Sequence, residues 1–324
     1  RIVIPTKATD IEQKAASTLQ DYIEQISGVK LRIVTDNKWE RNNEILLGNV
    51  KRDMLDTLDL EPLQKDGFIL RTKNKKLMIA GGTEKGTLYG VYAFLEDYLD
   101  CRKYSSKVSV IPKKESIKLE NIDTLQVPAF KYRETHYRDT YDPNFMEWHA
   151  LDSHRADDQD SDWGLWCHTN FSLVSPEIYG ESNPEYFSMI DGKRTLDNSD
   201  ICLSNPEVFE IAYNSLKELI EAKPEVSYWS VSQMDNNRYC RCPECSKANE
   251  KAGGPMGTIL PFTNKMARKF PDKIISTLSY WYSTKPPKDI VPEKNVNIML
   301  CNIGSPRHIP IQQGDPNFCK DLEG

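Results

Sequence analysis

The sequence predicts two α/β domains in succession, a small α/β sandwich over residues 1–124 and a (β/α) barrel over residues 125–324. Three observations lead to this prediction. Strand-like and helical hydrophobic patterns alternate along the chain, a stretch with prolines and lysines from Ile111 to Val127 separates two such series, and 324 residues suit two domains better than one. We therefore expect Ile111–Val127 to be a linker.

The first domain is predicted from short apolar runs that alternate with amphipathic segments. Residues 1–5, 31–34 and 44–47 read as strands, and residues 67–71 and 76–80 as a hairpin around the turn Thr-Lys-Asn-Lys. Apolar residues at helical spacing predict helices over residues 11–26, ended by Gly28, and over residues 88–99.

The second domain is predicted from a further series of strands and helices. Helices are expected from Pro206 to Ala222, where proline suits the first turn, and within Gly257–Phe270. The strand candidates are residues 131–137, 164–168, 200–203, 226–233, 274–282 and 296–301. Strands that alternate with helices pair in parallel, and a TIM-type barrel is their closed form. Only about six strands precede Gly324, and a complete barrel needs ~250 residues, so we expect the barrel to be incomplete at the C-terminus.

The composition limits the kinds of partner that the protein can bind. The net charge of −6 argues against nucleic acid, which is bound by clustered lysine and arginine, and no apolar run approaches the ~20 residues of a membrane helix. The chain starts at Arg1 in a strand-like run. We expect a leader to have been removed, which places the protein in the periplasm or outside the cell.

The segment Tyr228–Cys245, with the sequence YWSVSQMDNNRYCRCPEC, ties structure to chemistry most closely. It begins as a buried-type strand and breaks at Asp235. Catalytic groups of barrel enzymes lie where strands end, so Asp235 is the first candidate for a catalytic carboxylate. A structural interpretation stays open, in which Asp235 caps the loop or pairs with Arg238.

Hydrolysis of a glycosidic bond usually requires two carboxyl groups, one as acid and one as base or nucleophile. Glu134, which belongs to the first predicted strand of the second domain, is the candidate for the second. His136 and His168 lie near predicted strand ends, where an imidazole can donate to a sugar hydroxyl. Each of the two histidines is equally open to a purely structural interpretation.

Aromatic residues gather near the same predicted strand ends. Sugar rings stack on flat aromatic side chains, which makes Tyr280 and Trp281 candidates for substrate binding. Strand alternation would place Tyr280 and Tyr282 on one face and Trp281 on the other, so only one set would face a pocket.

Three cysteines, Cys240, Cys242 and Cys245, are clustered more densely than chance predicts. The Cys-Pro-x-Cys turn is suited to zinc, but no fourth ligand follows at the usual spacing. A structural zinc, a disulfide that leaves one thiol free, and neither of these are the three alternatives left open. The other cysteines, Cys202 among them, are expected to be free or core residues, and no cofactor is required.

Three stretches resemble known glycosidase families. Ala80–Tyr104, with Gly81, Gly82, Gly86, Thr87, Tyr89 and Gly90, resembles the end of the N-terminal α/β domain of bacterial alpha-glucuronidases and beta-hexosaminidases. Pro128–Glu134 is similar to the opening of the hexosaminidase barrel, in which an arginine at the first strand end holds a sugar hydroxyl. The matching residue is Arg133, whose guanidinium also suits the carboxylate of a uronic acid. Tyr228–Cys245, Asn183–Phe187 and Ile201–Val208 resemble a large uncharacterised glycosidase-like family of polysaccharide-degrading bacteria.

The resemblance implies a glycoside hydrolase that acts on a glycan-derived sugar, with a uronic acid and an amino sugar as the substrate classes left open. Hexosaminidases carry an adjacent Asp-Glu pair at the fourth strand end, whereas this chain has Asp235-Asn236, so their acetamido-assisted mechanism is not carried over. The alternative is a non-catalytic carbohydrate-binding protein that keeps the fold. A zinc-dependent hydrolase is a third hypothesis.

Overall fold

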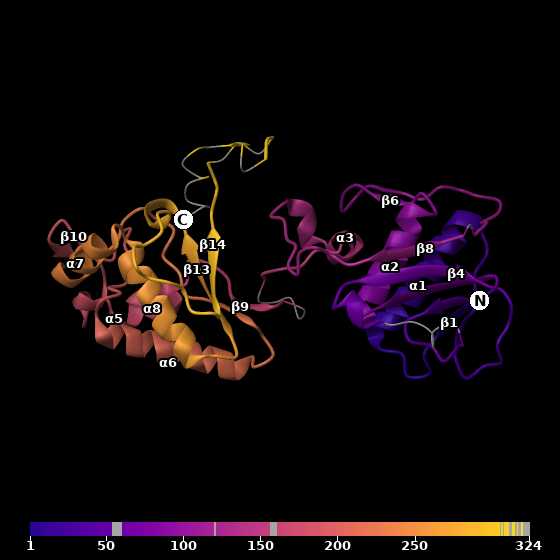
Figure 1. The fold of residues 1–324 in the computed structure, drawn as a ribbon, viewed down its shortest axis with the longest axis horizontal. Helices are drawn as coiled ribbons and strands as arrows, with labels where there is room; N and C mark the ends of the chain where they lie inside the picture. The colour runs from indigo at the N-terminus through magenta and orange to yellow at the C-terminus, as the bar shows by residue number, and fades with distance from the viewer. Residues whose placement is uncertain are drawn as a thin grey trace. The chain divides into compact units, whose positions relative to one another are not determined.

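The computed structural model describes residues 1–53, 60–119, 121–155, 161–304, 306, 308–310, 313–314, 316 and 319. The chain forms two compact units, Arg1–Asp152 and Ser153–Gly324, and the elements of each are shown in Figure 1. No helix in the described ranges is long and apolar enough to cross a membrane.

The first unit is built on a six-stranded mixed sheet in the order β2-β1-β3-β5-β4-β8. The first four of these strands are parallel to their neighbours, and β4 and β8 are antiparallel additions. The strands are β1 (Ile2–Ile4), β2 (Ile33–Thr35), β3 (Ile45–Leu47), β4 (Phe68–Lys73), β5 (Lys76–Gly81) and β8 (Asp123–Gln126). Because β8 pairs with β4, the end of the predicted linker Ile111–Val127 is an edge strand of this sheet, and the linker prediction is wrong there.

Two helices, α1 (Asp10–Ser27) and α2 (Glu84–Asp97), cover one face of this sheet. Alternation along the strands explains this, because Ile2 and Ile4 join the helix-side core whereas Val3 belongs to a smaller cluster with Val50. The capping box of Thr9 and Glu12 starts α1, and Gly28, with φ of 77°, ends it as predicted.

The glycines before and within α2 are explained by close backbone approach. A Cβ atom on Gly86 would lie 2.4 Å from the carbonyl oxygen of Gly67, so any side chain there would push α2 away from β4. The remaining elements of this unit are short: η1 (Glu61–Leu63), β6 (Arg102–Lys103), β7 (Ser109–Val110), η2 (Arg138–Tyr141) and α3 (Pro143–Trp148).

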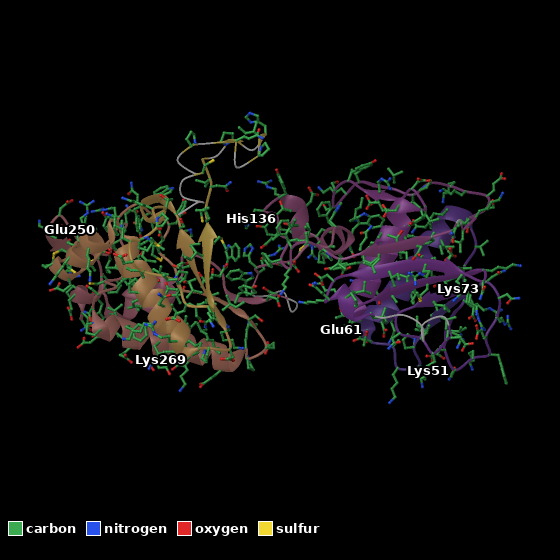
Figure 2. The ribbon with its side chains drawn as sticks, in the orientation of Figure 1. Lys51, Glu61, Lys73, His136, Glu250 and Lys269 are labelled. Carbon is green, nitrogen blue, oxygen red and sulfur yellow. The ribbon has the colours of Figure 1, made fainter. Side chains whose placement is uncertain are left out.

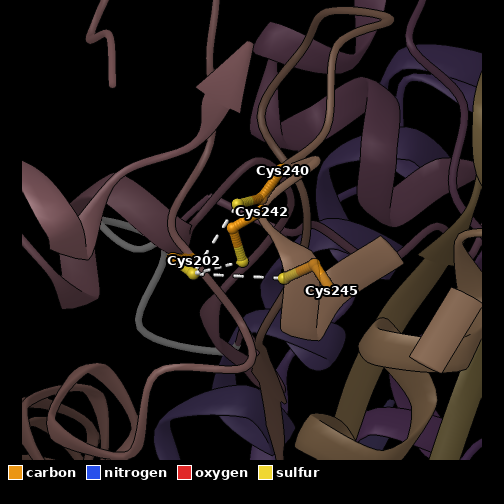
Figure 3. Close-up of side chains that lie close together, drawn as sticks. All are labelled: Cys202, Cys240, Cys242 and Cys245. Atoms are coloured by element: carbon orange, nitrogen blue, oxygen red, sulfur yellow. Dashed lines mark hydrogen bonds between the residues drawn. The ribbon is translucent and has the colours of Figure 1, made fainter. Parts of the chain in front are cut away.

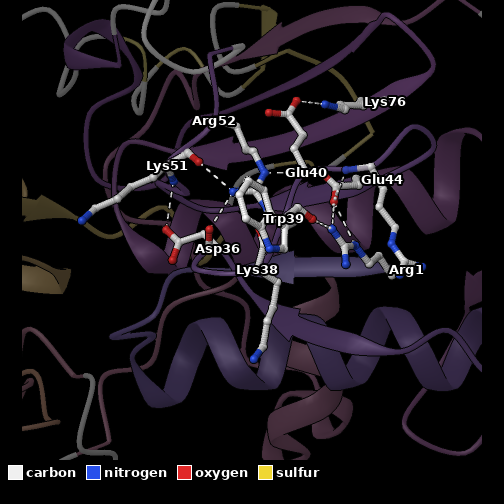
Figure 4. A network of polar contacts seen from close by, with 10 residues as sticks. Arg1, Asp36, Lys38, Trp39, Glu40, Glu44, Lys51, Arg52 and Lys76 are labelled. Atoms are coloured by element: carbon white, nitrogen blue, oxygen red, sulfur yellow. Dashed lines mark hydrogen bonds and ion pairs between the residues drawn. The ribbon is translucent and has the colours of Figure 1, made fainter.

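A buried polar network beside β3 holds the loops of the first unit (Figure 4). The side chain of Glu44 is fully buried and accepts hydrogen bonds from Arg1, from the Arg52 Nε at 3.3 Å and from the Arg41 backbone N–H at 3.1 Å. Burial alone would raise the pKa of Glu44, but these hydrogen bonds outweigh it and lower the pKa below its ordinary value.

Replacing Glu44 with glutamine should destabilise the first unit by about 2 kcal/mol at pH 7, because buried donors lose a charged acceptor. The pKa of Glu44 is lowered in the folded chain, so its contribution is fully present above the unfolded pKa of ~4.3 and is lost as the pH falls through the folded value. Denaturant unfolding of the wild type and of Glu44→Gln between pH 7 and pH 3 checks this. The difference between their free energies of unfolding should shrink as the pH falls.

The control is Glu40→Gln, since Glu40 forms an exposed ion pair with Lys76 that should matter by less than ~1 kcal/mol. Equal losses in the two variants, or a gap that does not depend on pH, would contradict the role of Glu44.

The second unit contains a four-stranded parallel sheet in the order β14-β13-β12-β9. Its strands are β9 (Trp163–Leu165), β12 (Tyr228–Ser230), β13 (Ile274–Ser279) and β14 (Val296–Leu300). The four strands follow one another across the sheet in the order in which they occur along the chain, with the separate hairpin of β10 (Met189–Ile190) and β11 (Lys193–Arg194) between β9 and β12 in the sequence. A Cβ atom on Gly164 would lie 2.3 Å from the Trp229 ring, so only glycine lets Trp229 pack across β9.

Helices α6 (Pro206–Ala222) and α8 (Met256–Lys269) pack against this sheet and confirm the two predicted helices (Figure 1). Their apolar faces enclose Trp229, Val231 and Ile275. Lys269 is exposed on α8, and Glu250 is exposed on the neighbouring helix α7 (Pro243–Ala252) (Figure 2). The smaller elements are α4 (Asn170–Leu173), α5 (Pro176–Tyr179), η3 (Pro184–Tyr186), the hairpin of β10 (Met189–Ile190) and β11 (Lys193–Arg194), α7 (Pro243–Ala252) and η4 (Trp281–Ser283).

Two of the six predicted strands of the second domain are wrong. Residues 131–137, all described, form bends and irregular backbone, and residues 200–203 contribute only an isolated bridge between Phe187 and Ile201. The four remaining strands form an open sheet in the described part of the chain. Along the chain, the boundary between the two compact units falls after Asp152, whereas the sequence predicted a domain boundary after residue 124.

Candidate functional site

The carboxyl ends of three parallel strands bring four of the predicted site residues together. His168 follows β9, Asp235 follows β12, and Tyr280 and Trp281 follow β13. The Tyr280 hydroxyl donates to Asp235 Oδ1 at 3.2 Å, and His168 Nε2 lies 3.9 Å from the same oxygen. In parallel α/β sheets this edge is where ligands bind, and the site therefore lies where the fold favours one.

Asp235 presents an accessible carboxylate. Its side chain is 65% exposed although both neighbours that hold it are more buried. No ion pair joins Asp235 to Arg238, both of which are described, so that half of the structural interpretation is wrong, whereas the loop-capping half stays a prediction. Burial and then the charge of Asp235 raise the pKa of the Tyr280 hydroxyl, which therefore keeps its proton and remains a donor at neutral pH.

The orientation of His168 fixes its tautomer. Nδ1 lies 2.8 Å from the carbonyl oxygen of Gln233, which only accepts hydrogen bonds, so Nδ1 carries the proton. In the neutral ring Nε2 is then an acceptor that faces the carboxylate of Asp235. A hydroxyl or water placed between these two acceptors could donate to one of them and approach the other.

Two residues of the site have left-handed backbone conformations that side chains rarely adopt. His168 has φ of 57° and Trp281 has φ of 54°. Hydrogen bonds hold both: the His168 N–H donates to Ser232 Oγ at 2.9 Å, and Gln233 Nε2 donates to the Tyr280 carbonyl at 3.1 Å. Such strain is typical of functional sites, where the surroundings impose the conformation.

Trp281 is half-exposed beside Tyr280, with ring centroids 5.3 Å apart. The predicted alternation of Tyr280, Trp281 and Tyr282 is wrong, because β13 ends at Ser279 and the three aromatic residues lie in a turn. Tyr280 consequently points to Asp235, whereas the Tyr282 hydroxyl donates to Asp200 Oδ2 at 3.4 Å.

Asp200 is a member of this site that sequence reasoning missed. It is buried and accepts hydrogen bonds from four donors: Asn170 Nδ2 at 2.7 Å, Ile201 N at 2.8 Å, Met234 N at 3.0 Å and the Tyr282 hydroxyl at 3.4 Å. Burial raises the pKa of Asp200 to about 6, because its effect outweighs that of the four donors, which favour the charged form. A carboxylate that holds the backbone next to Asp235 is a positioning residue, and its signal in the sequence is an acidic residue directly before an apolar run.

Three predicted residues, Arg133, Glu134 and His136, belong to the first unit. Arg133 lies at no strand end. Its guanidinium forms an ion pair with Asp66 at 2.7 Å and donates to the carbonyl oxygens of Phe130 and Ala150. Glu134 accepts from the Tyr132 hydroxyl, and His136 is exposed (Figure 2). Their catalytic and binding roles stay predictions.

The predicted cysteine group gains a fourth member in the structure. Cys202 lies against Cys240, Cys242 and Cys245, all four are buried, and all four sulfur atoms lie within 4.8 Å of one another (Figure 3). Cys202 is free and buried, as expected, but sequence reasoning did not place it with the other three cysteines. Cys202 is 38 residues before Cys240, so the spacing rules for metal sites could not reveal it.

Comparisons with known proteins agree with this glycosidase-like architecture. The profile of the family described as "Domain of unknown function (DUF4838)" matches residues 103–324, and that of the "Glycosyl hydrolase family 67 N-terminus" matches residues 1–94. The chain belongs to the DUF4838 family. Its predicted membership of an uncharacterised glycosidase-like family with an alpha-glucuronidase-type N-terminal domain is thereby confirmed.

Among curated proteins, the "Probable alpha-glucuronidase A" of Aspergillus terreus (strain NIH 2624 / FGSC A1156) is 26% identical over 102 residues. The match covers 28% of this chain and only 12% of that protein.

Among solved structures, a mutant Streptomyces plicatus beta-hexosaminidase in complex with its product GlcNAc is similar with a TM-score of 0.50 and 13% identity, over 99% of this chain and 67% of that one. The GH20 beta-N-acetylhexosaminidase of Streptomyces coelicolor A3(2) has a TM-score of 0.48 and 12% identity, over 99% of this chain and 67% of that one. A family GH115 4-O-methyl-alpha-glucuronidase has a TM-score of 0.47 and 11% identity, over 92% of this chain and 44% of that one. At 13% identity the likeness to the S. plicatus enzyme is one of fold alone.

Proposed function

We propose that the protein is a glycoside hydrolase and that Asp235 is one of its catalytic carboxylates. One observation carries this proposal: an exposed carboxylate at the carboxyl edge of a parallel sheet accepts from Tyr280 at 3.2 Å and lies near His168, and an exposed Trp281 lies beside Tyr280. A carboxylate, hydroxyl-binding groups and an aromatic platform are the parts that sugar hydrolysis requires.

The contacts of Asp235 favour a role as base or nucleophile. Tyr280 keeps its proton and orients one carboxylate oxygen, which leaves the other oxygen for water or for the anomeric carbon. A sugar hydroxyl near His168 Nε2 and Asp235 would donate to one of these two acceptors and so orient the ring. Glu134 stays the sequence-based candidate for the second carboxyl group.

We further propose that the four parallel strands are part of a (β/α) barrel. Their order along the sheet follows the sequence, as it does around such a barrel, and the similarity to the S. plicatus beta-hexosaminidase supports a fold of this type. A periplasmic or secreted location is part of the same proposal, since polysaccharides are met outside the cytoplasm.

Uronic acid and amino sugar substrates both remain in the proposal. The A. terreus relative is named as an alpha-glucuronidase, which suggests a uronic acid, and the S. plicatus structure holds the amino sugar GlcNAc. The residue after Asp235 is Asn236, whose Nδ2 donates to the Ser199 carbonyl at 2.9 Å, so an adjacent catalytic pair is absent at this strand end. That absence favours the second candidate function, a non-catalytic carbohydrate-binding protein.

A panel of chromogenic glycosides and glycan oligosaccharides, including uronic acid and amino sugar forms, tests the proposal through hydrolysis and through binding calorimetry. Trp281→Ala should weaken KM or Kd by about 3- to 10-fold, because a sugar face loses its aromatic partner. The matched control is Trp39→Ala, since Trp39 is 93% exposed in the first unit and should change neither quantity.

Binding that depends on Trp281 without any hydrolysis would favour the binding protein. Neither binding nor hydrolysis across the panel would overturn both functions.

A further inference from the structure

The four-cysteine group has the size of a single metal site. Cys202 Sγ lies 3.7 Å from Cys242 Sγ, 3.9 Å from Cys245 Sγ and 3.6 Å from Cys240 Sγ (Figure 3). Zinc–sulfur bonds of ~2.3 Å in a tetrahedron place the sulfur atoms about 3.8 Å apart, whereas a disulfide requires ~2.05 Å. All four cysteines are free of disulfides.

The surroundings of the four sulfurs are suited to negative charge. The Met189 N–H and Arg194 Nη1 donate to Cys240 Sγ at 3.3 and 3.6 Å. The Ser204 hydroxyl accepts from the Cys245 thiol at 3.0 Å and can turn to donate once that sulfur is a thiolate. Cys242 is the N-cap of the ten-residue helix α7, and Cys245 lies in its first turn, where the helix dipole favours thiolates. Backbone and side-chain donors of this kind are usual around zinc–thiolate centres.

We propose that Cys202, Cys240, Cys242 and Cys245 bind one Zn²⁺ ion that holds the loop after β12 in place. The inference does not rest on the glycosidase proposal. Four protein ligands close the coordination sphere, which makes the site structural and argues against the zinc-dependent hydrolase.

The ion would join two segments that are distant in the sequence. Cys202 follows the bridge at Ile201, whereas Cys240, Cys242 and Cys245 lie where the loop that begins at Asp235 runs into α7. A backbone hydrogen bond also ties this loop to the β10–β11 hairpin, since the Arg241 N–H donates to the Met189 carbonyl at 2.8 Å. The same loop is tied at its start, where Asp200 accepts from the Met234 N–H at 3.0 Å. Zinc would therefore fix the far end of the loop that carries Asp235.

Elemental analysis of the full chain, purified without chelators, tests the proposal. We expect about one zinc per chain in the wild type and in the control Cys301→Ser, and less than about a tenth of that in Cys202→Ser, because Cys301 is in the same unit but outside the group. The Tm of Cys202→Ser should fall by roughly 5 °C or more.

Measurements on the unmutated chain cover the case in which Cys202→Ser does not fold. Under native conditions the four thiols should resist alkylation until a chelator removes the metal, and replacement by Co²⁺ should give the intense visible bands of tetrahedral thiolate coordination. Iron in place of zinc, a mass lower by two hydrogens for each disulfide, or four reactive thiols with no metal would each overturn the proposal. None of these readouts depends on hydrolytic activity.

Discussion

Asp235→Asn is expected to lower the rate of glycoside hydrolysis by about 100- to 10,000-fold while KM changes little. The amide keeps the shape of the side chain, and its oxygen can still accept from the Tyr280 hydroxyl, so the fold and the ring-binding residues should be unaffected. What is lost is the negative charge that attacks the anomeric carbon or activates water. Initial rates on the best substrate of the glycoside panel give the measurement.

Asp272→Asn is the matched control, because Asp272 is exposed in the same unit and its one ion pair, with Lys273, spans 3.8 Å. Full activity in Asp235→Asn would remove Asp235 from the catalytic group. Chemical rescue of Asp235→Ala by formate or azide would separate a nucleophile, for which the anion substitutes at the anomeric carbon, from a residue that only orients substrate.

Asp200→Ala is expected to lower the free energy of unfolding by about 3 kcal/mol or more. Four donors would lose their acceptor in a buried place, and each unsatisfied donor costs about 1–3 kcal/mol before water or a local shift compensates. Urea unfolding measures the loss. Asp197→Ala, an exposed change in the same segment, should have an effect below about 0.5 kcal/mol.

The pH dependence of stability gives a second test of Asp200. Burial raises its folded pKa from 3.8 to about 6, so between these values the folded chain holds the proton more tightly than the unfolded chain does. The stabilisation that comes from protonated Asp200 is therefore present at low pH and is lost as the pH rises from about 4 to about 6. Asp200→Ala should lack this pH dependence. The same dependence of the free energy of unfolding on pH in the wild type and in Asp200→Ala would contradict the assignment.

Helices and helix ends were predictable because their signals are local. Hydrophobic spacing and Pro206 located α6 at the observed residues, and Gly28 ended α1 as expected. Two short strands were mispredicted, since runs of four to seven residues acquire their structure from partners. Residues 131–137 contain two tyrosines and a threonine, which favour strands, but have no neighbouring strand to pair with among the described residues.

The candidate site was predictable only where it follows strand ends. Asp235, His168, Tyr280 and Trp281 met at one sheet edge because parallel strands end together. Cys202 and Asp200 were missed, since their partners are 38 and 34 residues away and only the folded chain brings them together. The alternation of Tyr280, Trp281 and Tyr282 was mispredicted because strand periodicity does not continue past Ser279.

The left-handed conformations of His168 and Trp281 have a consequence for engineering. Glycine and asparagine are preferred at such positions, so a search for more thermostable variants would favour replacing both residues. Those replacements would remove the imidazole that lies near Asp235 and the indole that lies beside Tyr280. Heat resistance and sugar recognition would therefore compete at the same two positions, and a library selected for stability alone would be expected to erode the site it was meant to preserve.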